Sequence, residues 1–211
     1  FNFYPFHKDL IGKLLNIKKT PRTIINAPPR IGKTEIVKHF IAWLFLRNPA
    51  STIMYISYDL KLVARKNSDI QDILIWLADH FDIDALRMRS NNDGKTEWRN
   101  NATGMIIARG SGNNITGSGC STLLVLDDPN KPSDRMSTAM LKKRNEIFTS
   151  TIRNRINAPD VPIVIIQQRI AANDLSGFLL SGGSKEKWVH YNYPAINPDG
   201  TALCPERLPL E

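Results

Sequence analysis

The chain of 211 residues is 42% hydrophobic and 23% charged, a balance typical of an ordered globular domain and not of a disordered segment. Its longest apolar run, 40–46, is too short to cross a bilayer, so we expect no membrane association and no signal peptide. The two cysteines fit neither a disulfide framework nor a metal site, which favours a reducing compartment. A net charge of +8 makes nucleic acid the first candidate partner, although many basic proteins bind none.

The first half of the chain alternates signals for strands and helices. A β-branched run predicts a strand at 22–27, and a helix is expected over 33–46, ahead of Pro49. A second strand is predicted at 51–57. The long stretch 60–80 then carries apolar residues at helical spacing and predicts a second helix.

The second half opens with a polar stretch, 86–98, which we expect to be a loop. A strand is predicted at 104–110, and glycines predict a turn over 110–119. The apolar run 121–129 ends in two carboxylates and predicts a buried strand. A charge-rich helix is expected over 138–155.

A further buried strand is predicted at 161–169, and the proline-rich tail is typical of a linker. Alternating strands and helices, with three strands apolar throughout, predict an α/β fold with a mainly parallel central sheet and helices on both faces. Ligands bind such sheets at the carboxyl ends of the strands. Three polar clusters, 28–34, 127–128 and 167–169, fall at such ends, so we expect the functional site there.

The segment APPRIGKT, 27–34, follows the phosphate-loop template Gly-x-x-x-x-Gly-Lys-[Ser/Thr] except that Ala27 replaces the first glycine. In such a loop the backbone amides and the helix N-terminus cradle phosphate oxygens. Gly32 allows close approach, Lys33 reaches the β- and γ-phosphates, and the Thr34 hydroxyl binds Mg²⁺. The alternative is an ordinary strand–turn–helix with a chance match. The predicted nucleotide-binding residues of the loop are Pro28, Pro29, Arg30, Ile31, Gly32, Lys33 and Thr34.

Arg30 adds to the phosphate-loop interpretation. A guanidinium inside the loop would lie near the phosphates and could act in cis as an arginine finger, a group that accelerates hydrolysis. The alternative is an arginine that is simply exposed at the surface.

Asp127 and Asp128 follow the apolar run 123–126. Asp127 is expected to emerge beside the phosphate loop and to hold Mg²⁺ through water, as the partner of Thr34. Asp128 is expected to point elsewhere and to orient or deprotonate the attacking water, a role that Glu usually fills. Adjacent carboxylates also occur in plain turns and helix caps. Together with the loop upstream, they predict an NTPase.

Four blocks of sequence resemble, in their order and spacing, the ATPase half of the phage terminase large subunit; they are APPRIGKTEIV, LLVLDDPNK, QQRIAANDLSGFLL and YPAI…ALCPERLPLE. The resemblance runs from about residue 3 to 211. It implies a P-loop NTPase of the ASCE or RecA-like type, with an ATPase domain over 1–192. Residues 193–211 would be a linker towards a nuclease domain that this chain does not contain, so we expect the chain to be a piece of a longer protein.

The resemblance also implies roles for individual residues. Asp128, Arg30 and Lys33 would be catalytic. Residues Gln167, Gln168 and Arg169 fall where relatives carry a motif that senses the γ-phosphate and couples hydrolysis to movement, and we favour the last two as the sensors. His7 lies in a segment, 4–11, where relatives recognise adenine, and it either contacts the base edge or packs inside the protein.

Relatives often carry, in the glycine-rich turn, an arginine that reaches into the site of a neighbouring subunit. Ser118 occupies that position here. An arginine acting in trans would therefore come from elsewhere, and the candidates are Arg109, Arg153 and Arg155. Each of them is also readily explained as a solvated or DNA-facing charge.

The function that the resemblance implies is an ATP hydrolase that uses ATP and Mg²⁺ to translocate double-stranded DNA into a procapsid. The expected partners are double-stranded DNA, the procapsid portal, the small terminase subunit and further copies of the chain in a ring, in the cytoplasm of the host cell. The charged helix 141–155 either contacts DNA or presents a solvated face. Nuclease activity is not expected in this fragment.

Two alternatives remain open. A helicase-like P-loop ATPase would carry sequence blocks for a second motor domain, and none appear here. A nucleotide-gated DNA-binding or assembly module with negligible turnover is kept open by the Asp, in place of Glu, at position 128.

Overall fold

The structure, a computed structural model, describes residues 3–112, 115 and 117–207, without the side chains of 90–93. Its α-helices are α1 (Pro5–Leu15), α2 (Lys33–Arg47), α3 (Leu60–His80), α4 (Thr138–Ile147) and α5 (Leu175–Leu180). Its strands are β1 (Arg22–Asn26), β2 (Thr52–Ser57), β3 (Met88–Asp93), β4 (Glu97–Asn100), β5 (Met105–Gly110), β6 (Leu123–Asp127), β7 (Ile163–Gln167) and β8 (Val189–Asn192). Parts of the predicted turn 110–119 and of the predicted linker 193–211 lie outside the described residues.

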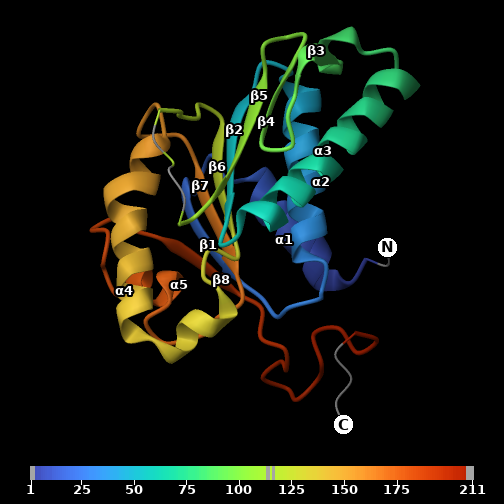
Figure 1. The fold of residues 1–211 in the computed structure, drawn as a ribbon. Helices are drawn as coiled ribbons and strands as arrows, with labels where there is room; N and C mark the ends of the chain where they lie inside the picture. The colour runs from blue at the N-terminus through green and yellow to red at the C-terminus, as the bar shows by residue number, and fades with distance from the viewer. Residues whose placement is uncertain (1–2, 113–114, 116, 208–211) are drawn as a thin grey trace.

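Within the described residues the strands form one eight-stranded sheet in the order β3-β4-β5-β2-β6-β7-β1-β8 (Figure 1). From β5 to β8 in this order, neighbouring strands run parallel. At the opposite edge β4 pairs antiparallel with β5, and β3 antiparallel with β4. The expected α/β class with a mainly parallel sheet is confirmed.

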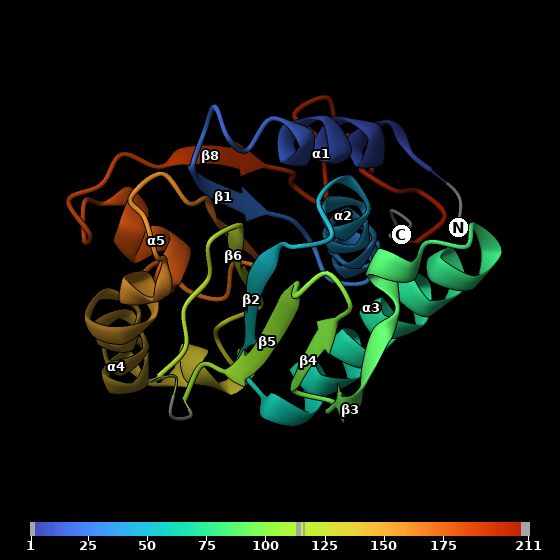
Figure 2. The ribbon, with the colours of Figure 1, turned by 90° about the horizontal axis from the view of Figure 1, so that it is seen from above.

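Helices cover both faces of the sheet, with α1, α2 and α3 on one side and α4 and α5 on the other (Figure 2). The residues of β6 before Asp127 show why the central strands are mainly apolar. Val125 packs in the core under α2 and α3, whereas Leu124 and Leu126 pack in the core under α5. Successive side chains of a strand point to opposite faces, so both sets must be apolar when both faces are covered. None of the helices within the described residues combines the length and apolar character that a bilayer-spanning helix needs.

The expectation of a loop over 86–98 is wrong, because this stretch forms β3 and the first two residues of β4. The two strands make an antiparallel hairpin at the sheet edge, where one side of the ribbon has no further strand and polar residues are tolerated. Trp98 anchors the hairpin. Its side chain is fully buried and its indole N–H donates to Asn67 Oδ1 on α3 at 2.9 Å.

The expected helix over 138–155 is α-helical only to Ile147. A π-helical segment, Phe148–Ile152, and a 3₁₀ turn, Arg153–Arg155, continue it. The sequence interpretation also missed α1, α5 and β8. The two helices are short, and β8 alternates half-buried with exposed residues, so none of the three carries a long periodic signal.

Candidate functional site

The three polar clusters meet at the carboxyl ends of β1, β7 and β6, which are adjacent in the sheet. Asn26 of β1 pairs with Gln167 of β7, and Ile166 of β7 pairs with Asp127 of β6. Because these strands are parallel, the segments that follow them leave the same edge of the sheet. The topology therefore brings the three polar clusters to the same edge of the sheet.

The segment 27–34 connects β1 to α2 as the phosphate-loop template requires. Its left-handed backbone positions are Arg30, with φ 63°, and Gly32, with φ 90°, at the N-terminus of α2. Ala27 is not among the positive-φ residues, and its N–H donates to the Gln167 carbonyl at 3.2 Å. The chain thus makes the turn without needing a glycine at position 27. Ile31 anchors the loop, fully buried in a small core beneath it.

His7 on α1 supports this loop from inside the protein. Its ring is fully buried, with Nε2 2.6 Å from the Ile31 carbonyl and Nδ1 accepting the Tyr4 N–H at 2.9 Å. Burial lowers the pKa of His7, which keeps the imidazole neutral and able to donate at one nitrogen while accepting at the other. Both nitrogens are thereby engaged, and the geometry favours packing over contact with a base edge.

Asp127 is a fully buried carboxylate whose two oxygens face different partners. Oδ1 accepts the Thr34 hydroxyl at 3.3 Å. Oδ2 accepts the Tyr55 hydroxyl at 2.7 Å and lies 2.6 Å from the Lys66 ammonium. Burial, and next the charge of Asp127, raise the pKa of Tyr55 well above its usual value, so the phenol stays a donor.

Tyr55 and Lys66 were missed in the sequence analysis. Tyr55 lies on β2, next to β6, and faces the same core as Val125. Lys66 lies in the middle of α3, and nothing in its local sequence distinguishes it from a solvated helix lysine.

Asp128 points away from this buried group, as expected. Its backbone is left-handed, with φ 49°, and its side chain is 32% exposed. Oδ2 lies 3.1 Å from the Lys33 ammonium, and Oδ1 accepts the backbone N–H of Gln168 at 3.1 Å. The strained turn therefore carries one acid into the interior and the next acid to the surface of the same edge.

The oxygen ligands at this edge fit a magnesium ion that also binds the phosphates of a nucleotide. Thr34 and Asp127 offer two oxygens on adjoining elements. Within the described residues no group of three or more His, Cys, Asp or Glu side chains could enclose a metal. Mg²⁺ typically takes one or two protein oxygens and completes its shell with substrate phosphates and water.

The segment 167–169 meets the site through its backbone more than through its side chains. The buried Gln167 has no hydrogen-bond partner at either side-chain atom among the described residues. Gln168 reaches Asp128 with its N–H. The Arg169 guanidinium lies 2.9 Å from the carboxylate of Asp174, the N-cap of α5.

Each of the three arginines that are candidates for a trans-acting group binds a partner within this chain. Arg109 lies 2.9 Å from Glu97, and Arg153 lies 2.7 Å from Glu186. Arg155 donates to the Thr151 carbonyl at 3.3 Å. Arg30, in contrast, is exposed, and its carbonyl accepts from Arg207 at 3.2 Å.

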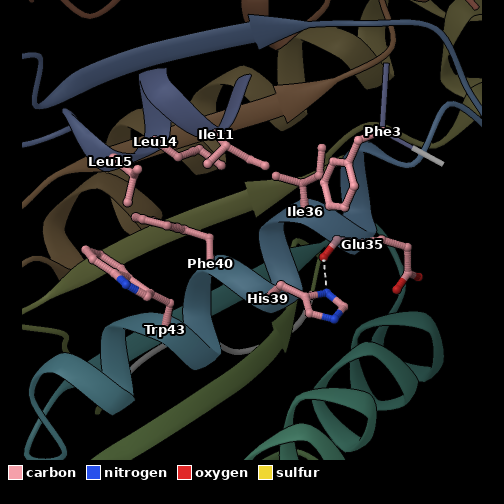
Figure 3. Close-up of a pocket in the computed structure, with 9 residues that line it drawn as sticks. All are labelled: Phe3, Ile11, Leu14, Leu15, Glu35, Ile36, His39, Phe40 and Trp43. Carbon is pink, nitrogen blue, oxygen red and sulfur yellow. Dashed lines mark hydrogen bonds between the residues drawn. The ribbon is translucent and has the colours of Figure 1, made fainter. Parts of the chain in front are cut away.

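An apolar groove with a volume of about 610 Å³ runs between α1 and α2 (Figure 3). One end begins at Glu35, directly after Thr34, and the other reaches Trp43. None of the predicted site residues lines it. The lining residues are Phe3, Ile11, Leu14, Leu15, Glu35, Ile36, His39, Phe40 and Trp43.

Neither a protein-family model nor a curated protein matches this sequence. Solved structures do match its fold. The large terminase of bacteriophage HK97 superposes with a TM-score of 0.62 at 18% identity, over 94% of this chain and 40% of that one. The ATPase domain of the large terminase of Thermus phage P74-26 gives 0.52 at 14% identity, over 78% and 68%. This chain has the fold of a large-terminase ATPase domain.

A third similar structure is the large terminase of a thermophilic bacteriophage in complex with ATP-γ-S. Its TM-score is 0.60 at 8% identity, over 91% of this chain and 45% of that one. At these identities the similarity establishes the fold. The chain spans less than half the length of this terminase and of the HK97 terminase.

Proposed function

We propose that this chain is the ATPase motor domain of a viral terminase large subunit, which hydrolyses ATP with Mg²⁺ to translocate double-stranded DNA into a procapsid. One observation carries the proposal. In a large-terminase fold, the loop 28–34 and the carboxylates Asp127 and Asp128 converge on one edge of the sheet. Hydrolysis of a nucleoside triphosphate needs this combination, with amides and an ammonium to hold the phosphates and carboxylates to bind the metal and orient the attacking water.

Each residue has a distinct part in the proposed reaction. The loop amides and Lys33 bind and orient the phosphates, and Asp128 orients the attacking water and accepts its proton. Arg30, exposed at the mouth of the loop, stabilises charge that develops on the transferred phosphoryl group. A bound Mg²⁺ ion, held by Thr34 and Asp127, would supply further charge stabilisation.

The route from hydrolysis to movement is proposed to run through 167–169. Asp128 accepts from the Gln168 N–H, and the next residue, Arg169, pairs with Asp174 at the start of α5. A change in the position of Asp128 would therefore be passed by the backbone to α5. The coupling role that we propose therefore belongs to the backbone of Gln168 and the ion pair of Arg169, and not to direct contact of their side chains with phosphate.

DNA contacts are proposed on α4. Lys142 and Lys143 are exposed there, whereas Arg144 is held by Asp134 at 3.4 Å and by Ser111 at 3.3 Å. Exposed lysines suit phosphate contacts without sequence preference. The further partners we propose are the portal, the small terminase subunit and a homo-oligomeric ring, in the cytoplasm of the host cell.

We also propose that the ATPase domain extends to residue 192 and that 193–211 leads towards a nuclease domain. The described part of this tail folds back on the domain. Tyr193 donates to Asp9 at 2.6 Å, Glu206 accepts from the Tyr4 hydroxyl, and Cys204 is buried beneath the phosphate loop.

The test is ATP turnover with and without double-stranded DNA, with Lys33→Ala as the inactive control. Magnesium-dependent turnover that DNA stimulates and Lys33→Ala abolishes would support the motor.

ATP binding without turnover, even with full-length protein and procapsids, would favour the nucleotide-gated module. The Lys33–Asp128 ion pair favours the nucleotide-gated module, because it pairs with each other the two side chains that catalysis needs. Strand separation on forked DNA would indicate a helicase-like ATPase.

A further inference from the structure

Lys66 is bonded to the most deeply buried acid of the site. It extends from α3 so that its ammonium lies 2.6 Å from Asp127 Oδ2 and 5.9 Å from the centre of the Tyr55 ring. The carboxylate of Asp127 is 0% exposed, whereas the Lys66 side chain is 17% exposed. The acid is therefore fixed in the interior, while the lysine retains a path towards solvent.

The physical consequence concerns the charge of Asp127. A buried carboxylate left without a counter-charge is strongly destabilising, and Lys66 supplies the counter-charge here. A divalent cation bound near Oδ1 would supply it as well. Two cations at one buried carboxylate repel each other, and the repulsion is large because the surroundings are poorly polarisable.

The geometry allows the Lys66 ammonium to leave Asp127 when a metal ion binds. Tyr55 also donates to Oδ2, so the carboxylate keeps its orientation towards Thr34 when the lysine leaves. The Lys66 ammonium ends a flexible four-carbon stem and is strongly hydrated when it reaches water. Exchange of Lys66 for a metal ion therefore requires no rearrangement of the strand.

We propose that Lys66 is an internal competitor of the divalent cation: it neutralises Asp127 when no metal is bound and withdraws when the metal–nucleotide complex enters. This inference rests on the proposed function, since it assumes that Asp127 lies beside the bound metal. It assigns to α3 a role that the sequence analysis did not give it. Cation binding at the sheet edge releases a side chain of α3.

The inference is tested by binding of Mn²⁺ in the presence of ADP, followed by the loss of the free Mn²⁺ signal in electron paramagnetic resonance. Lys66→Met removes the competing charge and keeps the stem, so Mn²⁺ should bind more tightly, by about 5–150-fold if the coupling is of ordinary size. A merely structural lysine would give unchanged or weaker binding, and either result overturns the inference.

Lys38→Met is the matched control. Lys38 on α2 is also largely buried and doubly paired, with Glu35 and Asp69 each at 2.7 Å, but it does not contact Asp127. Its replacement should lower stability without tightening Mn²⁺ binding. Mn²⁺–ADP binding that is normal in the wild type and equal in Lys66→Met refutes the competitor role alone. Absence of Mn²⁺–ADP binding in the wild type would overturn the proposed function and the inference together.

A measurement on the wild-type chain covers the case in which Lys66→Met does not fold. Acetylation of individual lysines is followed by mass spectrometry, with ADP and either Mg²⁺ or a chelator. Lys66 should react several-fold faster with Mg²⁺, because it leaves its carboxylate, while Lys38 should react at the same rate in both conditions. An unchanged rate at Lys66 contradicts the proposal.

Discussion

The ammonium of Lys33 lies 3.1 Å from Oδ2 of Asp128, so the residue expected to hold phosphate is paired with the residue expected to activate water. Lys33 is 6% exposed at its side chain and Asp128 is 32% exposed. The pair thus closes the edge of the site, with the carboxylate towards solvent. A phosphate group entering the loop would compete with Asp128 for the same ammonium, and Asp128 would then be released to accept a proton.

Replacing Asp128 with Asn separates binding from chemistry. The amide keeps the shape of the side chain but cannot accept a proton, so ATP turnover should fall by about 10²–10⁴-fold. Nucleotide affinity should be unchanged or higher, since Lys33 loses its competing carboxylate. Phosphate release and fluorescent-nucleotide binding measure the two effects. Asp160→Asn, at an exposed acid outside the site, is the control, and wild-type turnover in Asp128→Asn would remove the catalytic assignment.

Arg30→Gly should raise stability and lower activity together. Arg30 holds φ 63°, a conformation that costs a residue with a Cβ about 1–2 kcal/mol and costs glycine far less. Denaturant titration should therefore show a free energy of unfolding that is about 1 kcal/mol higher. If the guanidinium acts as a cis finger, turnover should fall by about 10³–10⁵-fold.

Lys185→Gly is the matched variant for Arg30→Gly. Lys185 also carries a positive charge at a left-handed position, with φ 58°, but lies far along the chain from the loop. It should show the gain in stability without loss of turnover. Full activity in Arg30→Gly would assign Arg30 to the surface alternative.

The parts of the candidate site that could be predicted from the sequence are those whose residues are contiguous in the chain. The loop 27–34 and the pair Asp127–Asp128 each follow a strand signal directly, and parallel topology then brings them together. Tyr55 and Lys66 reach Asp127 across separations of 72 and 61 residues. No local pattern reports such a contact, because it depends on how β2 and α3 pack against β6.

The same contrast holds for the fold. The central strands were predicted because both of their faces are buried and their residues are apolar up to the last one, as in β6 and β7. The edge strands β3 and β8 were missed, since their polar residues resemble a loop when their pairing partners are unknown. The π-helical end of the 138–155 segment likewise arises from tertiary packing, with Phe148 and Ile152 buried in the core of the α5 face.

Gln167→Met tests whether a buried polar side chain is kept at a cost to stability. Both side-chain polar atoms of Gln167 are buried without partners among the described residues, and each such atom costs about 1–3 kcal/mol. Methionine has a similar shape and no such cost, so the variant should unfold at higher denaturant concentration. If Gln167 takes part in coupling, its ATP turnover should fall at least severalfold.

Asn26→Leu is the comparison for Gln167→Met. Asn26 is the neighbour of Gln167 in the sheet, but its amide donates to Ser176 at 3.0 Å and its carbonyl lies 2.8 Å from His190 Nε2. Removing these bonds should lower stability by about 1–3 kcal/mol. A Gln167→Met variant that is less stable than wild type would show that Gln167 has partners that matter.

The stability of the domain should fall as the pH drops below about 6.5, and His7 should contribute to the fall. Burial holds the folded-state pKa of His7 below the value of about 6.5 that histidine has in an unfolded chain. The unfolded chain therefore binds more protons in this range, and the stability that neutral His7 contributes is present above pH 6.5 and is lost as the pH falls towards the folded pKa. Unfolding titrations between pH 7.5 and 5 measure the slope.

His7→Gln should flatten this slope without abolishing it, because burial also lowers the pKa of His190, which both proteins retain. The glutamine can still donate to the Ile31 carbonyl, so the loop should keep its anchor while losing its sensitivity to acid. Nucleotide affinity should weaken over the same pH range in the wild type, since protonation of His7 breaks the bond that Nδ1 accepts from Tyr4 and loosens the support of the phosphate loop. A slope that is equal in wild type and His7→Gln would locate the acid sensitivity elsewhere in the domain.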